Sequence, residues 1–251
     1  MNRRDWLSRA LATAGVMTLA ACERAGQAGQ RLLVSAEDLT RRAQRLIIPR
    51  DALAPEYDIS EISSDFRANG SIDPAASDYV ALRDAGFADY RLEIGGLVER
   101  PLSLSLAELR ARPSRTQITK HDCVEGWTSI GQWSGAKLGD LLDEAGLKPE
   151  AKYIVFYCFD ALTQTETGPR YYESIDLIDA YHPQTILAYD MNGETLPVPH
   201  GAPLRLRVER QLGYKHAKYI RRIEAVESFD HIAGGQGGYW PDRGYEWYAG
   251  I

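Results

Sequence analysis

Hydrophobic and polar positions alternate over several short stretches of the chain, which is typical of strands with one buried face. The pattern predicts strands over residues 90–94, 116–119, 153–159, 186–189, 204–208 and 219–226. Two glycine-containing pairs predict turns, Gly95–Gly96 after the first strand and Asn192–Gly193 as a hairpin turn. The Gly- and aromatic-rich tail, residues 234–251, is expected to wrap the surface.

Helical spacing is confined to short segments. Residues 36–46 and 172–181 predict helices, and Ser105 with Glu108 forms a capping box for a helix over 106–111. Ser134 is expected to cap a further helix that carries Leu138, Leu141 and Leu142 and ends at Gly146. Because helices are few and strands follow no regular strand–helix repeat, we expect an α+β fold built on a mixed sheet.

The N-terminal residues resemble an export signal. Arg3 and Arg4 precede an apolar stretch over 10–21, as in a twin-arginine signal, and residues 19–22 resemble a bacterial lipobox ending in Cys22. The stretch is shorter than the roughly 20 residues of a membrane span. We therefore expect a twin-arginine signal peptide with a lipobox over 1–22, a tether and packing segment over 23–45, and one domain over 46–251. Ordinary signal cleavage, or a first amphipathic helix, are the alternatives.

Composition narrows the class of protein. A chain of 251 residues with 44% hydrophobic positions holds enough apolar material for one sizeable core. The formal charge of −6 comes from well-mixed signs without a basic run in the mature region. Nucleic acid is therefore not expected as a partner.

Two cysteines remain once Cys22 is assigned to the lipid anchor. A single disulfide between Cys123 and Cys158 is the plain alternative in an oxidising compartment. Cys123, however, lies in the segment HDCVEGW, which we expect to be a loop between a strand and a helix, a position suited to chemistry. His121 favours a thiolate there and Glu125 opposes it, so charge alone leaves the state of the sulfur open.

A second group of polar residues follows downstream in the segments HGAPLR and GYKHAK. It contains His200, Arg205, Lys215, His216 and Lys218. Such a group suits a multiply charged anion such as a phosphate. An exposed strand face with ordinary surface lysines is the alternative.

These segments carry a resemblance in order and spacing. HDCVEGW, WSGAKLGDLL, LAYDMNGETLP, HGAPLRL and GYKHAKYI resemble the molybdopterin-binding domain of the sulfite oxidase family over roughly residues 60–250. The resemblance implies a mixed-sheet domain of that type and a molybdenum ion held by one molybdopterin and by Cys123. The immunoglobulin-like dimerisation domain of sulfite oxidases has no counterpart in the chain, so a monomer is expected.

The resemblance also implies the residues that bind the cofactor. The downstream positions are His200, Arg205, His216, Ala217 and Lys218, with Lys215 a weaker candidate. SDFRANG at 64–70 adds Arg67 and Asn69. Cys158 lies where relatives contact the pterin, and a small buried residue is the equal alternative.

The loop after Cys123 distinguishes this chain from sulfite oxidases. It lacks their arginine and resembles the CVEAW loop of the periplasmic methionine sulfoxide reductase catalytic subunit. Because Glu125 would repel an anion, sulfite is disfavoured. We expect oxygen-atom transfer on a small substrate, sulfoxide or N-oxide reduction being favoured, with Cys123 and Glu125 as catalytic residues. Glu125 orienting the loop is the alternative, and Trp127 would help shape the pocket.

The expected electron route lies outside the chain. No CxxCH haem motif is present, so electrons would come from a separate partner, such as a membrane cytochrome b or a soluble cytochrome c. The protein is expected in the periplasm, touching the membrane only through its lipid. Rival interpretations are a sulfite dehydrogenase, a zinc- or copper-binding periplasmic protein using His121, Cys123 and Cys158, and a non-catalytic lipoprotein.

Overall fold

Strands dominate the part of the chain that a computed structural model describes, residues 39–46, 49–162 and 168–251. The predicted signal peptide, Cys22 and most of the tether lie outside these residues. Residues 39–46 are helical, as predicted, and belong to a separate unit, Met1–Ile48; the unit Pro49–Ile251 holds all that follows. None of the described helices combines the length and the apolar character needed to cross a membrane.

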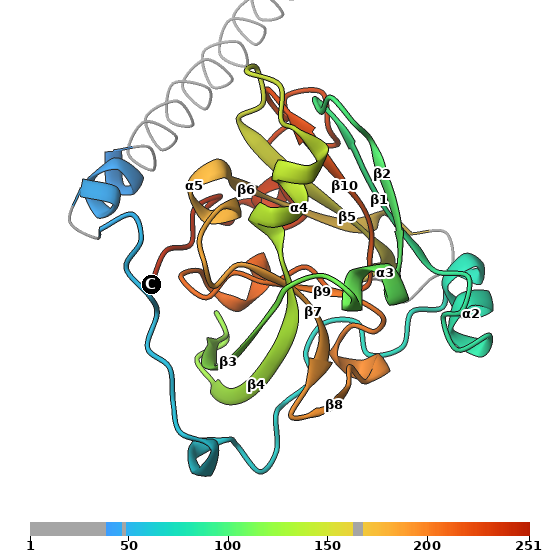
Figure 1. Ribbon diagram of the computed structural model, residues 1–251. Coiled ribbons are helices and arrows are strands. Elements are labelled where there is room, and N and C mark those ends of the chain that lie inside the picture. The colour runs from blue at the N-terminus through green and yellow to red at the C-terminus, as the bar shows by residue number, and fades with distance from the viewer. Residues whose placement is uncertain (1–38, 47–48, 163–167) are drawn as a thin grey trace, which may run out of the picture. The chain divides into compact units, whose positions relative to one another are not determined.

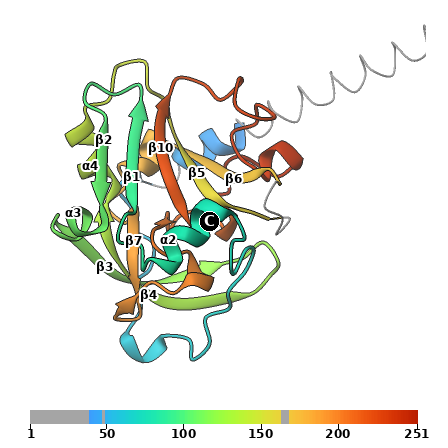
Figure 2. The ribbon, with the colours of Figure 1, turned by 90° about the vertical axis from the view of Figure 1, so that its right-hand side faces the viewer.

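The first sheet is mixed and has the strand order β2-β1-β10-β5-β6. Its strands are β1 (Arg91–Gly96), β2 (Leu102–Ser105), β5 (Tyr153–Ala161), β6 (Arg170–Asp176) and β10 (Ile220–Val226). β1 and β10 run parallel, with Ile94 opposite Ile223, and the other neighbours are antiparallel. Figure 2 shows these strands side by side, with α2 (Ser77–Asp84) in front of them.

The second sheet is antiparallel, in the order β3-β4-β7-β8, and β9 pairs with the other side of β7. Its strands are β3 (Ser114–Asp122), β4 (Thr128–Lys137), β7 (Ile186–Met191), β8 (Glu194–Thr195) and β9 (Arg205–Arg207). The β3–β4 hairpin lies beside β7 in Figure 1. The two sheets and the scarcity of helix confirm the predicted α+β class.

Helices are short and connect the strands. Besides α2 they are α3 (Leu106–Arg110), α4 (Leu138–Ala145), α5 (Leu177–Ala180) and the 3-10 turns η1 (Ile59–Glu61), η2 (Val198–His200), η3 (Gly213–Lys215) and η4 (Pro241–Arg243). α4 buries Leu138, Leu141 and Leu142 completely, and each such burial contributes about 1.5–3 kcal/mol. It ends, as predicted, at Gly146, which adopts φ +69°.

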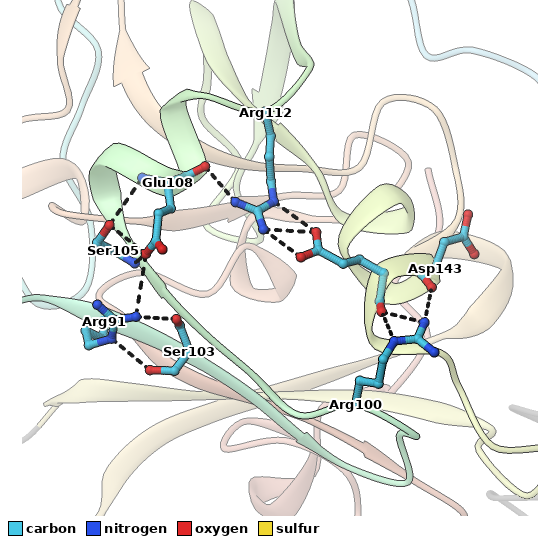
Figure 3. Close-up of polar contacts among 8 residues, drawn as sticks. Arg91, Arg100, Ser103, Ser105, Glu108, Arg112 and Asp143 are labelled. Carbon is cyan, nitrogen blue, oxygen red and sulfur yellow. Dashed lines mark hydrogen bonds and ion pairs between the residues drawn. The ribbon is translucent and has the colours of Figure 1, made fainter.

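The predicted capping box is present at α3. The Ser105 side chain accepts from the Glu108 backbone N–H, while the Glu108 carboxylate accepts from the Ser105 backbone N–H (Figure 3). Arg112 then joins α3 to α4 by bonding both the Glu108 carbonyl and the Glu144 carboxylate. The hairpin prediction is also confirmed, since Asn192 and Gly193 take φ of 52° and 83° between β7 and β8.

Three local predictions are wrong. Ser134 caps no helix: it pairs with Thr116 inside β4, and α4 begins only after Lys137. Of residues 172–181, 172–176 belong to β6 and only 177–180 are helical, as α5; β6 is buried on both faces and so lacks the alternation that marks a half-buried strand. Gly95 and Gly96 close β1 instead of forming a turn; a Cβ on Gly96 would lie 2.3 Å from the Ala225 carbonyl oxygen.

The C-terminal tail does more than wrap the surface. Tyr239 and Ala249 are buried, Gly238 bridges to Glu173 of β6, and Gly250 bridges to Gln211. The tail is therefore part of the packed domain, and two of its aromatic side chains reach the site described next.

Candidate functional site

Cys123 lies in the turn of the β3–β4 hairpin. Its N–H donates to the Trp127 carbonyl at 3.0 Å and its carbonyl accepts from the Gly126 N–H at 3.0 Å. Gly126 has φ +86°, which only glycine adopts readily. The predicted position between a strand and a helix is thus wrong, because β4 continues where a helix was expected, but the loop is confirmed and is held rigidly by two paired strands.

A cavity of about 230 Å³ opens beside this turn. Among its lining residues are the predicted Arg67, Asn69, Cys123, Glu125, His200, Arg205, His216 and Lys218. Segments that are far apart in sequence therefore meet at one site. Cys158, Ala217 and Lys215 do not line it: all three are buried, and the Lys215 ammonium is bonded to Glu173 Oε1 at 2.5 Å.

The two cysteines among the described residues, Cys123 and Cys158, are both free thiols in different surroundings. Cys123 is half-buried and faces the cavity, whereas Cys158 is buried in β5. Burial above all, and then Asp160, raise the pKa of the Cys158 thiol well above its usual value. Cys123 and Cys158 form no disulfide, so that alternative is wrong. Cys158 has the environment of a small core residue.

Asn69 is the one described side chain that donates a hydrogen bond to the Cys123 sulfur. Its Nδ2 lies 3.4 Å from Sγ. A donor aimed at sulfur stabilises the thiolate, which is the form that binds metals. Asn69 itself is held through its carbonyl, which accepts from Lys218 Nζ at 2.9 Å.

Glu125 and its neighbours form the exposed rim of the cavity. The Glu125 carboxylate accepts from Trp127 Nε1 at 3.0 Å, and Arg67 Nη2 lies 3.9 Å away. The Arg67 guanidinium also lies 5.4 Å from the centre of a Trp127 ring. Arg67 offsets part of the Glu125 charge, which weakens the electrostatic argument against an anionic substrate. The bond to Trp127 fits the alternative that Glu125 orients the loop, while its catalytic role stays a prediction.

The inner wall of the cavity gathers several basic groups, and Asp160 is the one buried acid among its lining residues. Burial first and neighbouring cations second lower the pKa of His200 to about 4 and that of Arg205 to about 9. Burial also lowers the pKa of His216 well below its usual value, with Arg207 the next cause. A multiply charged anion bound here would relieve this repulsion, so the wall suits a phosphate.

Four buried polar atoms of the lining residues have no hydrogen-bond partner among the described residues. They are Ser71 Oγ, Asp160 Oδ1, Arg205 Nε and His216 Nδ1. His216 Nε2 lies 3.0 Å from the Gln211 carbonyl and must donate to it, which leaves Nδ1 as an acceptor in the neutral ring. The orphaned Arg205 donor and the orphaned His216 acceptor fit a ligand that carries both phosphate and amino groups, as a pterin cofactor does.

Lys218 faces the cavity but its three donors are engaged. Nζ lies 2.9, 2.5 and 2.8 Å from the carbonyl oxygens of Asn69, Ser71 and Pro199. An ammonium has three protons, so these contacts use all of them. Burial foremost, then Arg205, lower its pKa to about 7. Lys218 therefore holds the segment that carries Asn69, and its direct contact with the cofactor stays a prediction.

Several lining residues carried no usable signal in the sequence. Tyr171, Tyr214, Trp240 and Tyr245 come from β6, η3 and the tail. Asp160, at the end of β5, also lines the cavity, and burial raises the pKa of its carboxyl to about 6. Alternating charges at Arg205, Arg207 and Glu209 are the one pattern that marks a polar strand face, and the structure shows that face to be buried.

Metal ligands are not clustered in the described residues. No group of three or more His, Cys, Asp or Glu side chains there could hold a metal ion. The zinc or copper alternative finds no ligand set in this part of the chain. A metal that takes one protein thiolate and draws its other ligands from a cofactor is compatible with a single cysteine facing a cavity.

Comparisons with known proteins agree with this geometry. Residues 79–231 match the family model described as oxidoreductase molybdopterin binding domain. A putative protein-methionine-sulfoxide reductase subunit YedZ1 of Azospira oryzae is 36% identical over 249 residues, which cover 99% of this chain and 87% of that protein. The protein-methionine-sulfoxide reductase catalytic subunit MsrP of Xanthomonas axonopodis pv. citri is 35% identical over 161 residues, 61% of this chain and 50% of its own length.

A solved structure adds a likeness in fold. The sulfane dehydrogenase SoxCD from Paracoccus pantotrophus aligns with a TM-score of 0.50 and 29% identity, over 56% of this chain and 39% of that one. The aligned part of this chain thus spans about half the length of the MsrP relative and less of SoxCD.

Proposed function

Because the chain belongs to the oxidoreductase molybdopterin binding domain family, we propose that this molybdopterin-dependent oxidoreductase reduces a sulfoxide, methionine sulfoxide in a protein being the favoured substrate. The observation that carries the proposal is the position of Cys123, half-buried at a cavity whose inner wall is basic. The name of the relative that matches almost the whole chain supports the choice of substrate.

The proposed reaction balances as a two-electron reduction. The sulfoxide S–O bond breaks, the sulfur keeps an electron pair as a thioether, and the oxygen leaves as water after taking up two protons and two electrons. Bound molybdenum with one molybdopterin supplies the redox chemistry, and the protein supplies binding and electrostatics. A reduced one-electron carrier, a cytochrome by chemical class, supplies the electrons one at a time.

The residues of the chain have separate tasks in this proposal. Cys123 would ligate the metal, with the Asn69 amide donating to its sulfur. His200, Arg205 and His216 would bind the phosphate and amino groups of the pterin. Arg67 and Glu125, at the rim, are placed to meet the substrate.

The wider setting is part of the proposal. We infer export by the twin-arginine route over residues 1–22, a tether over 23–45 and the domain over 46–251, with lipidation at Cys22. A periplasmic monomer held by lipid would stay near a membrane cytochrome b or a soluble cytochrome c. The names of the two methionine sulfoxide reductase relatives call them subunits, which supports a separate electron-transfer partner.

A paired cysteine experiment tests the proposal. Full-length protein from cells able to make molybdopterin is assayed for molybdenum, pterin and reduction of a methionine sulfoxide peptide by reduced benzyl viologen. Cys123→Ala should lose turnover, while Cys158→Ala, a buried cysteine away from the cavity, should retain both metal and activity. Full activity of Cys123→Ala would refute the ligand assignment, and faster oxidation of sulfite than reduction of the peptide would refute the substrate.

A further inference from the structure

A buried ion pair lies directly behind the cavity, at the end of β9. Arg207 and Glu209 both have fully buried side chains. Arg207 Nε lies 2.9 Å from Glu209 Oε1, and Nη2 lies 2.6 Å from Oε2, so the pair is bidentate. Gln117 Nε2 donates to the same Oε1 at 2.8 Å and fixes the carboxylate from the other side.

The same guanidinium also contacts two residues of β3, Thr119 and His121, with Nη2 lying 3.4 Å from Thr119 Oγ1. Arg207 Nη1 lies 3.0 Å from His121 Nδ1. A guanidinium in a protein only donates, so Nδ1 must accept. In the neutral ring the proton is then on Nε2, because the hydrogen bond made by one ring nitrogen decides which nitrogen carries the proton.

The opposite edge of the ring faces the site. His121 lines the cavity and lies two residues before Cys123, at the end of β3. Its Nε2 has no hydrogen bond to any described residue. A Cβ on Gly213 would lie only 2.6 Å from that nitrogen, so glycine at the start of η3 permits the ring to sit there.

His121 and His216 then present opposite polarity to the same space. Their rings meet edge to face, with centroids 5.0 Å apart. His216 offers an acceptor at Nδ1 because its Nε2 donates to the Gln211 carbonyl. His121 offers a donor at Nε2 because its Nδ1 accepts from Arg207.

We propose that Arg207, locked by Glu209, is a positioning residue that holds His121 as an Nε2–H donor to an oxygen acceptor bound beside Cys123. The acceptor oxygen belongs either to the cofactor or to the sulfoxide substrate. The inference rests on the proposed function for the identity of the acceptor, while the geometry of the ring is independent of it.

A different result is expected if the Arg207–Glu209 ion pair has only a structural role. Breaking such a pair destabilises a protein, while replacing both partners by uncharged groups of similar size is often tolerated. The structural interpretation therefore predicts that Arg207→Met combined with Glu209→Gln changes nothing at His121. Our proposal predicts that in the same double variant the His121 ring is no longer held in a single tautomer.

Nitrogen NMR of full-length holoenzyme labelled with 15N-histidine reads the tautomer directly. The chain has five histidines, and the resonances missing from His121→Gln assign the ring. We expect a pyridine-type Nδ1 and a pyrrole-type Nε2 in the wild type, and a tautomer mixture in the double variant. Arg210→Met with Asp179→Asn, which alters a second buried pair, is the matched control and should leave the His121 resonances unchanged. A wild-type ring protonated at Nδ1, or a double variant identical to wild type, would overturn the proposal.

Side-chain replacement at His121 tests the donor itself. Glutamine places an amide nitrogen near the Nε2 position, and asparagine places one near Nδ1. His121→Gln should therefore retain at least about tenfold more function than His121→Asn. A fall in molybdenum and pterin content in His121→Asn assigns the acceptor to the cofactor. Full cofactor with a lower kcat or a raised KM for the sulfoxide peptide assigns it to the substrate.

Equal cofactor content and equal kinetics in the two replacements would contradict the donor role. A wild-type protein without molybdenum would instead remove the proposed function, and the NMR result would still stand for the ring. The two failures are therefore distinguishable.

Discussion

Lys218 offers the sharpest test of how the cavity is built. Its ammonium bonds the carbonyls of Asn69, Ser71 and Pro199, so Lys218→Met removes all three contacts at once. The Ser71 carbonyl keeps the Tyr219 hydroxyl at 2.9 Å as a donor, and the Pro199 contact is exposed enough for water to replace it. The Asn69 carbonyl loses its charged donor.

The expected cost follows from these losses. A hydrogen bond to a charged group contributes about 1.5–3 kcal/mol, and a buried acceptor left without a donor costs about 1–3 kcal/mol. With two of the three carbonyls retaining another partner, we expect Lys218→Met to lower the free energy of unfolding by about 2–4 kcal/mol. Lys152→Met is the control, because Lys152 forms an exposed pair with Glu227 and should change stability by less than about 0.5 kcal/mol.

Urea denaturation of apo and cofactor-loaded protein separates an anchor from a ligand. If Lys218 anchors the 69–71 segment, its replacement lowers the midpoint in both forms, with little change in the slope. If Lys218 instead bound the cofactor directly, the loss would appear only in the loaded form, since a ligand stabilises only the state that binds it. An apo variant as stable as Lys152→Met would refute the anchoring role.

Three further predictions concern the same site. Burial raises the pKa of the Asp160 carboxyl from 3.8 to about 6, so the protonated form favours folding and up to about 3 kcal/mol of stability is lost as pH rises from about 4 to 6. Asp160→Asn should therefore flatten the pH dependence of stability over this interval. A wild-type protein whose urea midpoint rises from about pH 4 to 6 contradicts this. Asn69→Leu should lower the molybdenum content of the purified protein, because the hydrogen-bond donor 3.4 Å from the Cys123 sulfur is lost, and elemental analysis would measure it; a metal content equal to that of the wild type counts against the contact. Gly213→Ala should cost about 1–3 kcal/mol, because the new Cβ meets the His121 ring at 2.6 Å, and thermal unfolding that matches wild type would show that the ring is free to move.

Local signals predicted the elements that depend on neighbouring residues. The Ser105 capping box, the Asn192–Gly193 turn and the end of α4 at Gly146 are all short-range features, and all three are confirmed. The helix predicted over 172–181 is wrong over 172–176 for a tertiary reason, and only 177–180 are helical. Burial of β6 on both faces by distant segments removes the period-2 pattern on which a strand prediction depends.

At the site, too, local motifs predicted some of the residues that line the cavity, while contacts between distant segments were not predictable. Motif position led to Cys123, Asn69, Arg205 and His216, and the fold gathers them at one cavity. Lys215 belongs to the same motif, yet its partner Glu173 lies 42 positions earlier and turns it away from the cavity. Spacing within a motif carries no information about such a partner.

Sequence analysis singled out His121 as a neighbour of Cys123, but its contact with Arg207 was not predicted, for a related reason. Their contact joins β9 to β3 across 86 positions, and neither residue is unusual in its own segment. Charges that alternate along a strand normally indicate a solvated face. Here β9 lies behind the cavity, so the same alternation supplies a buried polar layer.

The central claim is that the Cys123 thiolate holds molybdenum at this cavity. X-ray absorption at the molybdenum edge tests it most directly, comparing the loaded wild type with loaded Cys123→Ser and with Cys158→Ser as the control. We predict that Cys123→Ser removes one sulfur ligand from the metal while Cys158→Ser leaves the ligand set intact. An identical sulfur shell in wild type and Cys123→Ser would contradict the account.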